Sequence, residues 1–276
     1  MIAGKVMMDR NAPDYLTDTA ESSYTQSKAL IERWHGKGRL HYAVTPRFAP
    51  TSTPEQLTLA GQLLGEYPDL YLQTHISENL QEIEWVKQLF PERKGYLDVY
   101  DHYRLLGERS VFAHGVHLCD DECARLAETG SAVAFCPTSN FFLGSGLFNL
   151  PMAEKHKLNV GIGTDVGAGT SFSILHTLNE AYKVMQLQGA RLSPFKSLYL
   201  ATLGGARALR LEQRIGDLQP GSDADFLVLD YHATPLLSYR LQQARDIAEK
   251  LFVLMTLGDD RTVLQTYAAG NRVHQR

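Results

Sequence analysis

Short apolar runs alternate with longer amphipathic stretches through the first 164 residues of the chain. The apolar runs have the length of strands that are buried on both faces of a parallel sheet. The stretches between them have the spacing of helices with one apolar face. We therefore expect a series of βα units. The predicted strands are 2–8, 40–45, 70–75, 110–113, 132–136 and 160–164, and the predicted helices are 20–36, 54–67, 79–90, 120–130 and 151–157.

The pattern changes after residue 164. Two further helices are predicted, at 173–188 and 194–209, and then a segment rich in Gly, Asp and Pro that ends in an apolar strand at 226–229. A helix at 239–250 should lead into a hairpin-like end with strands at 251–257 and 262–267 and a tight turn at Gly270-Asn271. We expect residues 1–212 to form an α/β barrel domain and residues 213–276 a small C-terminal β subdomain.

Six strands that alternate with helices suit either a barrel or an open, doubly wound sheet. A closed α/β barrel needs eight strands, and periodicity alone does not decide between the two. The polar residues favour the barrel, because several strands end in chemically able side chains and barrel active sites gather at these ends.

Composition narrows the class of protein. The hydrophobic fraction of 44% and the charged fraction of 21% are those of a soluble globular protein. A net charge of -4 gives no reason to expect nucleic acid as a partner, and no apolar stretch approaches the ~20 residues that cross a bilayer. Cys119, Cys123 and Cys136 are sparse and odd in number, which favours reduced thiols and a cytoplasmic location.

Three strand ends carry groups that could hold a metal. His75 ends one strand, His114 another, and Asp165 a third, while Glu78 follows His75 by three residues. One such histidine is more often a structural residue, but the ends of parallel strands converge in space. Two imidazoles and a carboxylate suit zinc, and Glu78 could transfer protons beside the metal without binding it.

Arg47 and Phe48 follow the strand at 40–45 and have two interpretations. They could be a surface arginine beside a core aromatic. They could also present a planar guanidinium and a ring together to a flat, polar heterocycle.

Several sequence runs resemble those of guanine deaminases, which are zinc-dependent amidohydrolases. The runs are PRF (46–48), THISE (74–78), FAHG (112–115), CPTSN (136–140), GTDVGAG (163–169) and GDLQPGSDADFLVLD (216–230). The resemblance covers essentially the whole chain, in order. The resemblance implies a TIM-like (β/α)8 barrel and the hydrolytic deamination of guanine to xanthine and ammonia, a step of purine catabolism.

The resemblance also implies roles for individual residues. His75 and Asp165 would bind zinc, with His75 also at the substrate, and Asp165 would accept a proton from the activated water. Glu78 would contact guanine and relay a proton to its ring and to the leaving amine. His114 would orient the activated hydroxide, and Arg47 and Phe48 would clamp the substrate. Members of this family often form homodimers.

One family feature is missing. The chain contains no His-x-His pair, which in the family supplies two zinc ligands from the first barrel strand, and its first strand matches the third. We expect an incomplete barrel that lacks two strands and retains zinc weakly. Two alternatives stay open: a deaminase or chlorohydrolase of another aminated heterocycle, and a non-catalytic fragment.

Overall fold

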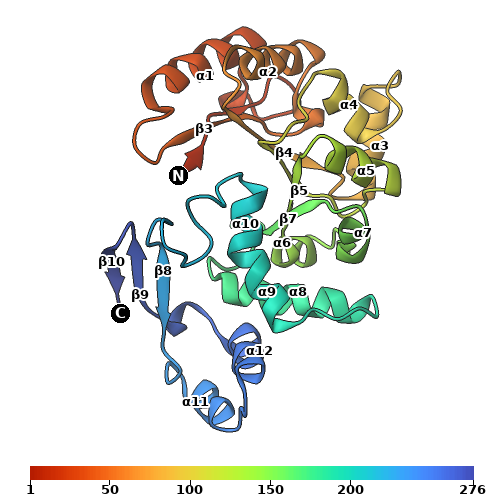
Figure 1. The fold of residues 1–276 in the computed structure, drawn as a ribbon. Helices are drawn as coiled ribbons and strands as arrows, with labels where there is room; N and C mark the ends of the chain where they lie inside the picture. Colours follow the sequence, from red (N-terminus) through yellow and green to blue (C-terminus); the bar gives the residue numbers. More distant parts are fainter. The chain divides into compact units, whose positions relative to one another are not determined.

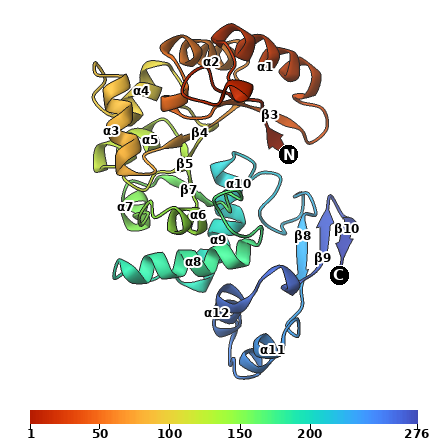
Figure 2. The same cartoon turned by 180° about the vertical axis from the view of Figure 1, so that it is seen from behind.

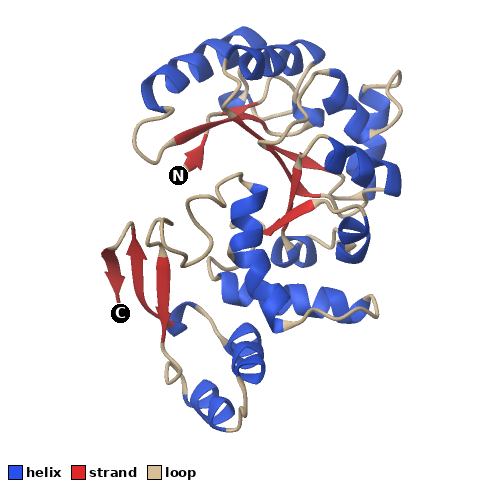
Figure 3. Ribbon diagram, viewed as in Figure 1, coloured by secondary structure: helices blue, strands red, loops and turns tan.

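A computed structural model describes all 276 residues, in two compact units. The first unit comprises Met1–Val133 and Met152–Leu158, and the second comprises Ala134–Pro151 and Asn159–Arg276. Helices and strands alternate along the chain in the first unit, as Figure 3 shows by colour. The predicted α/β class is confirmed, and the division expected after residue 212 stays a prediction.

Parallel strands form the centre of the first unit (Figure 1). Both β1 and β2 pair with β3, β3 pairs with β4, and β4 pairs with β5. These strands contain fully buried side chains such as Val44, Leu72 and Phe112, as expected for a sheet covered on both faces. The strands are β1 (Ile2–Ala3), β2 (Val6–Met7), β3 (His41–Pro46), β4 (Tyr71–Ile76) and β5 (Ser110–His114).

Helices of the first unit begin at recognisable caps. Thr19, Thr53 and Asn79 each accept a hydrogen bond from the backbone N–H three residues ahead, which satisfies one of the unpaired donors of a first helical turn. The helices are η1 (Asp14–Leu16), α1 (Ala20–Trp34), η2 (Ala49–Thr51), α2 (Pro54–Glu66), α3 (Leu80–Leu89), α4 (Tyr96–His102) and α5 (Asp120–Glu128).

The strand order is β1-β3-β4-β5-β6-β7, with the units divided within β6. Most of the helices that come after β6 in the sequence belong to the second unit (Figure 2). Close packing of α10 on β7 requires small residues, because a Cβ on Gly161 would lie 3.2 Å from the Cα of Gly205. Two elements of this stretch, β6 (Ala132–Phe135) and α7 (Leu150–Lys155), are divided between the units. The others are α6 (Pro137–Phe142), β7 (Asn159–Ile162), α8 (Ile174–Leu187), α9 (Pro194–Ala201) and α10 (Leu203–Ala208).

The C-terminal part of the second unit holds a separate antiparallel sheet in the order β10-β9-β8. The rings of Phe226 and Tyr267 stack across β8 and β9 at 4.4 Å between centroids. Leu237, Leu241, Val253 and Leu254 form a buried cluster between two helices. The elements are β8 (Phe226–Leu229), α11 (Pro235–Gln242), α12 (Ile247–Leu257), η3 (Asp260–Thr262), β9 (Val263–Ala268) and β10 (Asn271–Gln275).

The strand predicted at 251–257 is wrong, because these residues belong to α12. The side chain of Asp246 caps that helix by accepting from the Glu249 N–H, and the apolar run then continues as helix to Gly258. A short continuous apolar run does not distinguish a strand from a buried helix. The helix predicted at 239–250 is in fact the end of α11 and the start of α12.

Two other predicted elements are interrupted, and two helices were not predicted. The strand expected at 2–8 is interrupted at Gly4, where a Cβ would lie 1.7 Å from the Ala43 carbonyl oxygen. The helix expected at 194–209 is broken at Thr202, whose φ of -126° and ψ of -103° are not helical. Both α4 and α6 were missed. No helix of the structure has the length and apolar character to cross a membrane.

Candidate active site

The loop that follows β3 carries the predicted substrate clamp. We call residues 47–49 the clamp loop. The Arg47 side chain is exposed, and its guanidinium carbon lies 5.1 Å from the centroid of the Phe48 ring. Phe48 is half-buried, and its ring meets Trp85 edge-on at 6.4 Å between centroids. The cation and the ring therefore lie side by side, which both interpretations of the pair allow, and the clamp role stays a prediction.

His75 lies at the end of β4 and is oriented by the clamp loop. Its Nδ1 is 2.7 Å from the backbone carbonyl oxygen of Arg47. Because a carbonyl oxygen can only accept, Nδ1 must carry the proton. Nε2 is then the ring nitrogen with a lone pair, which is the form in which histidine binds metals.

His114 ends the neighbouring strand and is paired with Ile76 in the β4–β5 register. Its ring stacks on that of His75 at 5.2 Å between centroids and 30° between planes. The side chain is only 1% exposed. Its φ of 72° lies in the left-handed region, which is uncommon for a residue other than glycine. Such strained positions cluster at functional sites.

Glu78 follows Ser77, which also has a positive φ, of 47°. One Glu78 carboxylate oxygen lies 3.7 Å from Nε2 of His114, and the side chain is 15% exposed. Glu82 holds the backbone here by accepting from the Glu78 N–H at 3.0 Å and from the Asn79 N–H at 3.3 Å.

The Glu82 carboxyl is itself buried and bonded. The Tyr96 hydroxyl donates to its other oxygen at 2.5 Å. Burial raises the pKa of Glu82 above its usual value. The backbone at Glu78 is therefore held by Glu82, in the first turn of α3. Glu82 is itself held by Tyr96 of α4.

Asp165 lies in the second unit, in the loop after β7. Its φ is 47°, and its carbonyl oxygen accepts from the Gly169 N–H at 2.6 Å. The turn is tight, because a Cβ on Gly169 would lie 1.8 Å from the Thr164 carbonyl oxygen. Arg47, Phe48, His75, Glu78 and His114 are thus brought together within the first unit, and Asp165 belongs to the second.

The donor set fits zinc in part. The hydrogen bond from Nδ1 of His75 to a backbone carbonyl is the outer contact that metal-binding histidines usually make. Asp165 offers a carboxylate. No group of three or more His, Cys, Asp or Glu side chains is placed to hold a metal. His75 and Asp165 would be two ligands of a zinc site that needs three or four.

Several residues that contact the predicted ones were not singled out from the sequence. Trp85 meets Phe48, Glu82 holds the Glu78 amide, and Tyr100 contacts both the clamp loop and β4. Only Glu82 had a sequence signal, because Asn79 and Glu82 have the spacing of a capping box. The tyrosines and Trp85 gave none, because aromatic residues on helices are ordinary core residues.

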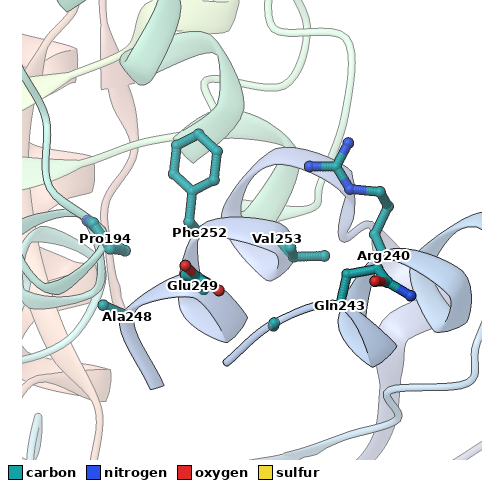
Figure 4. Close-up of a pocket in the computed structure, with 8 residues that line it drawn as sticks. Pro194, Arg240, Gln243, Ala248, Glu249, Phe252 and Val253 are labelled. Atoms are coloured by element: carbon teal, nitrogen blue, oxygen red, sulfur yellow. The ribbon is translucent and has the colours of Figure 1, made fainter. Parts of the chain in front are cut away.

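A cavity of about 460 Å³ opens elsewhere in the second unit, between α9, α11 and α12. Arg240, Gln243, Glu249 and Phe252 line it together with small and apolar residues (Figure 4). None of the predicted site residues lines it. The Glu249 carboxylate is bonded to Arg245 at 2.7 Å.

The chain is similar to known proteins in sequence and in fold. The guanine deaminase of Escherichia coli (strain K12) is 61% identical over 276 residues, which are 100% of this chain and 63% of that protein. A solved structure of E. coli guanine deaminase superposes with a TM-score of 0.99 and covers 100% of this chain and 65% of its own. The structure of guanine deaminase from C. acetobutylicum with bound guanine is 31% identical, with a TM-score of 0.89, and covers 98% of this chain and 64% of its own.

The chain therefore spans less than two thirds of the length of these relatives. Zinc is bound in the structure of a more distant neighbour, an adenosine deaminase from Xanthomonas campestris, which is 23% identical with a TM-score of 0.85 and matches 98% of this chain and 59% of its own. The model of the amidohydrolase family matches residues 1–273, nearly the whole sequence. On the strength of that match and of the parallel strand order, this chain belongs to the amidohydrolase family.

Proposed function

We propose that the chain provides the substrate clamp and the proton-transfer groups of a guanine deaminase, which hydrolyses guanine to xanthine and ammonia. The observation that carries this proposal is the row of rings formed by Phe48, His75 and His114, with successive centroids 6.1 and 5.2 Å apart and with Glu78 beside the last. Identity of 61% to the E. coli guanine deaminase over the whole chain supports the same reaction.

The clamp suits guanine in shape and in hydrogen bonding. Guanine is flat, and a purine gains about 1–3 kcal/mol from stacking on an aromatic side chain. It also presents two acceptors side by side, O6 and N7, which the fork of an arginine can bond together. Phe48 would supply the stacking surface, and Arg47 would supply the donors.

His75 and Asp165 are the residues of this chain that would hold zinc. When bound, zinc would lower the pKa of a water molecule towards about 7, so that it could attack the carbon that bears the amine. Two ligands are too few for a zinc site, so the proposal includes further ligands from the part of the relatives that this chain does not match.

Glu78 and His114 would handle protons and orientation. Glu78 is partly exposed, so its protonated carboxyl group could give a proton to the purine ring and, once it has taken up another, protonate the leaving amine. His114 is buried and 3.7 Å from Glu78, so it would orient the attacking water and the carboxylate without leaving its place. The attacking water would give its first proton to Asp165. After attack it would give its second proton to Glu78, which passes it to the amine as ammonia leaves, and Asp165 would then return its proton to Glu78 for the next turnover. These roles require the side chains of Glu78, His114 and Asp165 to face one substrate.

The test uses two proteins. One is this chain, and the other, which we call the completed chain, is this chain joined to the part of the E. coli relative that it does not match. Both are loaded with zinc and assayed for loss of guanine and formation of xanthine. We expect turnover by the completed chain, loss of that turnover on treatment with a chelator, and recovery on return of zinc.

A completed chain that folds, retains zinc and leaves guanine unchanged would contradict the proposal. Adenine and an aminated triazine serve as competing substrates. Turnover of either of them at a higher kcat/KM than guanine would assign the site to another heterocycle. The variant Arg47→Ala then shows whether the clamp sets the choice, because it should reduce the preference for guanine.

A further inference from the structure

A buried tyrosine on α4 lies behind the candidate site. The Tyr100 side chain is fully buried, with its ring 5.6 Å from Phe112 of β5 and 5.5 Å from Tyr96, measured between centroids. Burial raises the pKa of Tyr100, so its hydroxyl keeps its proton at neutral pH. The hydroxyl can therefore both donate and accept a hydrogen bond, at a position closed to solvent.

The Tyr100 hydroxyl joins two segments that are far apart in sequence. It donates to the backbone carbonyl oxygen of His75 at 2.8 Å. It accepts from the backbone N–H of Ala49 at 2.9 Å. One oxygen atom thus connects the end of β4 to the last residue of the clamp loop.

A second hydroxyl completes the connection. Thr74 Oγ1 lies 3.2 Å from the Tyr100 oxygen and 3.2 Å from the Arg47 carbonyl oxygen. That carbonyl is the one that accepts from Nδ1 of His75. The position of the Arg47 carbonyl therefore sets the orientation of the His75 ring. Thr74 and the His75 N–H, at 3.3 Å, bond that carbonyl directly, whereas Tyr100 acts on it through Ala49, two residues further along the clamp loop, and through the end of β4.

We propose that Tyr100 is a positioning residue, whose hydroxyl fixes the clamp loop against the end of β4 and so keeps His75 in its Nδ1-protonated, metal-binding orientation. The consequence for substrate and zinc rests on the proposed function, whereas the consequence for His75 is a property of this chain alone. The bonds of the Tyr100 hydroxyl to the clamp loop and to His75 both go to backbone groups. Its effect passes through two backbone groups.

Tyr100→Phe removes the hydroxyl and keeps the ring. The Ala49 N–H and the His75 carbonyl would lose a buried partner, which is unfavourable unless they move. We expect the clamp loop to shift and the Nδ1–Arg47 bond to weaken. In ¹⁵N spectra of this chain, the His75 signals should move from one dominant Nδ1-protonated tautomer towards a mixture of tautomers.

Tyr42→Phe is the matched control. Tyr42 is also buried in the first unit, and its hydroxyl also accepts from a backbone N–H, that of Lys5 at 3.1 Å. Its loss should lower thermal stability, by less than Tyr100→Phe because one backbone partner is lost and not two, and should leave the His75 signals unchanged. Thr74→Val is the second variant in case Tyr100→Phe does not fold, and it should shift the same signals in the same direction by a smaller amount.

Zinc affinity and the KM for guanine, both measured on the completed chain, are the second readout. Loss of outer contacts to a metal-binding histidine typically costs 10–100-fold in metal affinity, so we expect Tyr100→Phe to bind zinc about tenfold more weakly. Its KM for guanine should rise at saturating zinc, with kcat less affected. Tyr42→Phe should change neither quantity more than about twofold, because its bond lies away from the site and a lost bond there costs stability alone.

Three outcomes decide the matter. A His75 tautomer change in Tyr100→Phe or Thr74→Val that is absent from Tyr42→Phe supports the proposal. Unchanged His75 signals in the folded variants, or equal changes in the control, overturn it. If the unsubstituted completed chain does not turn over guanine, the proposed function fails, and the His75 spectra still decide the role of Tyr100.

Discussion

The ends of β4 and β7 both present a predicted functional residue through a backbone with positive φ, but they are stabilised differently. At the end of β4, Ser77 has a φ of 47°, and at the end of β7, Asp165 has the same value. The first turn is tied to residues distant in sequence, because the Tyr100 hydroxyl bonds to His75 at 2.8 Å. The second closes on itself through the bond from the Gly169 N–H to Asp165 at 2.6 Å.

This difference affects what a substitution does. A turn held from outside keeps its shape when one of its own side chains is shortened, so such a substitution reports on chemistry. A turn closed by its own backbone depends on each of its residues having the right conformation, and there a substitution reports on geometry. Substitutions after β4 should therefore change the rate of the reaction, and substitutions after β7 the placement of a metal ligand. All activities refer to the completed chain.

Glu78→Gln should have the largest effect. The amide keeps the size of the side chain, and the Glu78 backbone N–H can still donate to Glu82. The amide cannot carry the proton that a carboxyl group transfers. General acid–base groups typically contribute 10²–10⁴-fold, so we expect kcat to fall by about a thousandfold with little change in stability. Steady-state rates and thermal unfolding measure the two quantities.

The same change at Glu84 is the control, because this glutamate lies on the exposed face of α3 and pairs with Lys87 at 4.0 Å. It should leave kcat unchanged. A Glu78→Gln variant with near-normal kcat would show that another group transfers the proton.

Gly169→Ala should damage the other end without removing any ligand. The new Cβ would meet the Thr164 carbonyl oxygen at 1.8 Å, so the backbone around Asp165 must move. We expect about tenfold weaker zinc binding, in line with the sensitivity of metal sites to the placement of their ligands. Competition with a chelating dye measures the affinity.

Gly65→Ala is the control for Gly169→Ala. This glycine is exposed in α2, and a Cβ there meets nothing within 4 Å. Alanine should stabilise the chain by about 0.5 kcal/mol, because it restricts the unfolded backbone. Equal zinc affinity in the two variants would show that the turn after β7 tolerates movement.

Phe48→Ala should weaken substrate binding at the end of β3. Loss of base stacking on an aromatic ring typically costs about 1–3 kcal/mol, so KM for guanine should rise about tenfold or more while kcat changes less. Phe195→Ala, at an exposed phenylalanine of α9, is the comparison and should leave KM unchanged. An unchanged KM in Phe48→Ala would return Phe48 to the role of a core aromatic.

Glu82 gives the smallest effect, on the pH dependence of stability. Burial raises its folded-state pKa above the usual 4.5, so the folded state binds the proton more tightly than the unfolded state does. Its contribution to stability is therefore full below about pH 4.5 and is lost as the pH rises through the folded-state pKa. Glu82→Gln should flatten this fall in urea unfolding between pH 4 and 7 without zinc, whereas Glu84→Gln should follow the unsubstituted chain.

The parallel strands could be predicted because each is a short apolar run between helical stretches. Five of the six predicted strands match observed ones to within two residues at each end, and His75 and His114 fall at strand ends as expected. The run at 251–257 could not be assigned in this way. A continuous apolar run suits a strand and a buried helix equally well. That this run forms a helix depends on the Asp246 cap and on packing against α11.

The chemically able side chains of the candidate site could be predicted from the sequence, but the residues that hold them in place could not. His75, Glu78 and His114 are recognisable because strand ends converge and because the THISE and FAHG runs resemble a family. Tyr100 carries no such mark. Its role depends on a short helix that was missed and on two backbone groups, and hydrogen bonds to backbone do not depend on the sequence of the partner.

Positive φ at residues 77, 114 and 165 also limits how these positions can vary. Glycine and asparagine enter the left-handed region most readily, whereas valine and isoleucine are excluded from it by their branched Cβ. In a saturation library selected for folding alone, these three sites should therefore retain glycine and asparagine and lose the branched residues. Selection for turnover should then discard glycine and asparagine at 114 and 165, and the difference between the two selections would separate the demand of the backbone from the demand of the reaction.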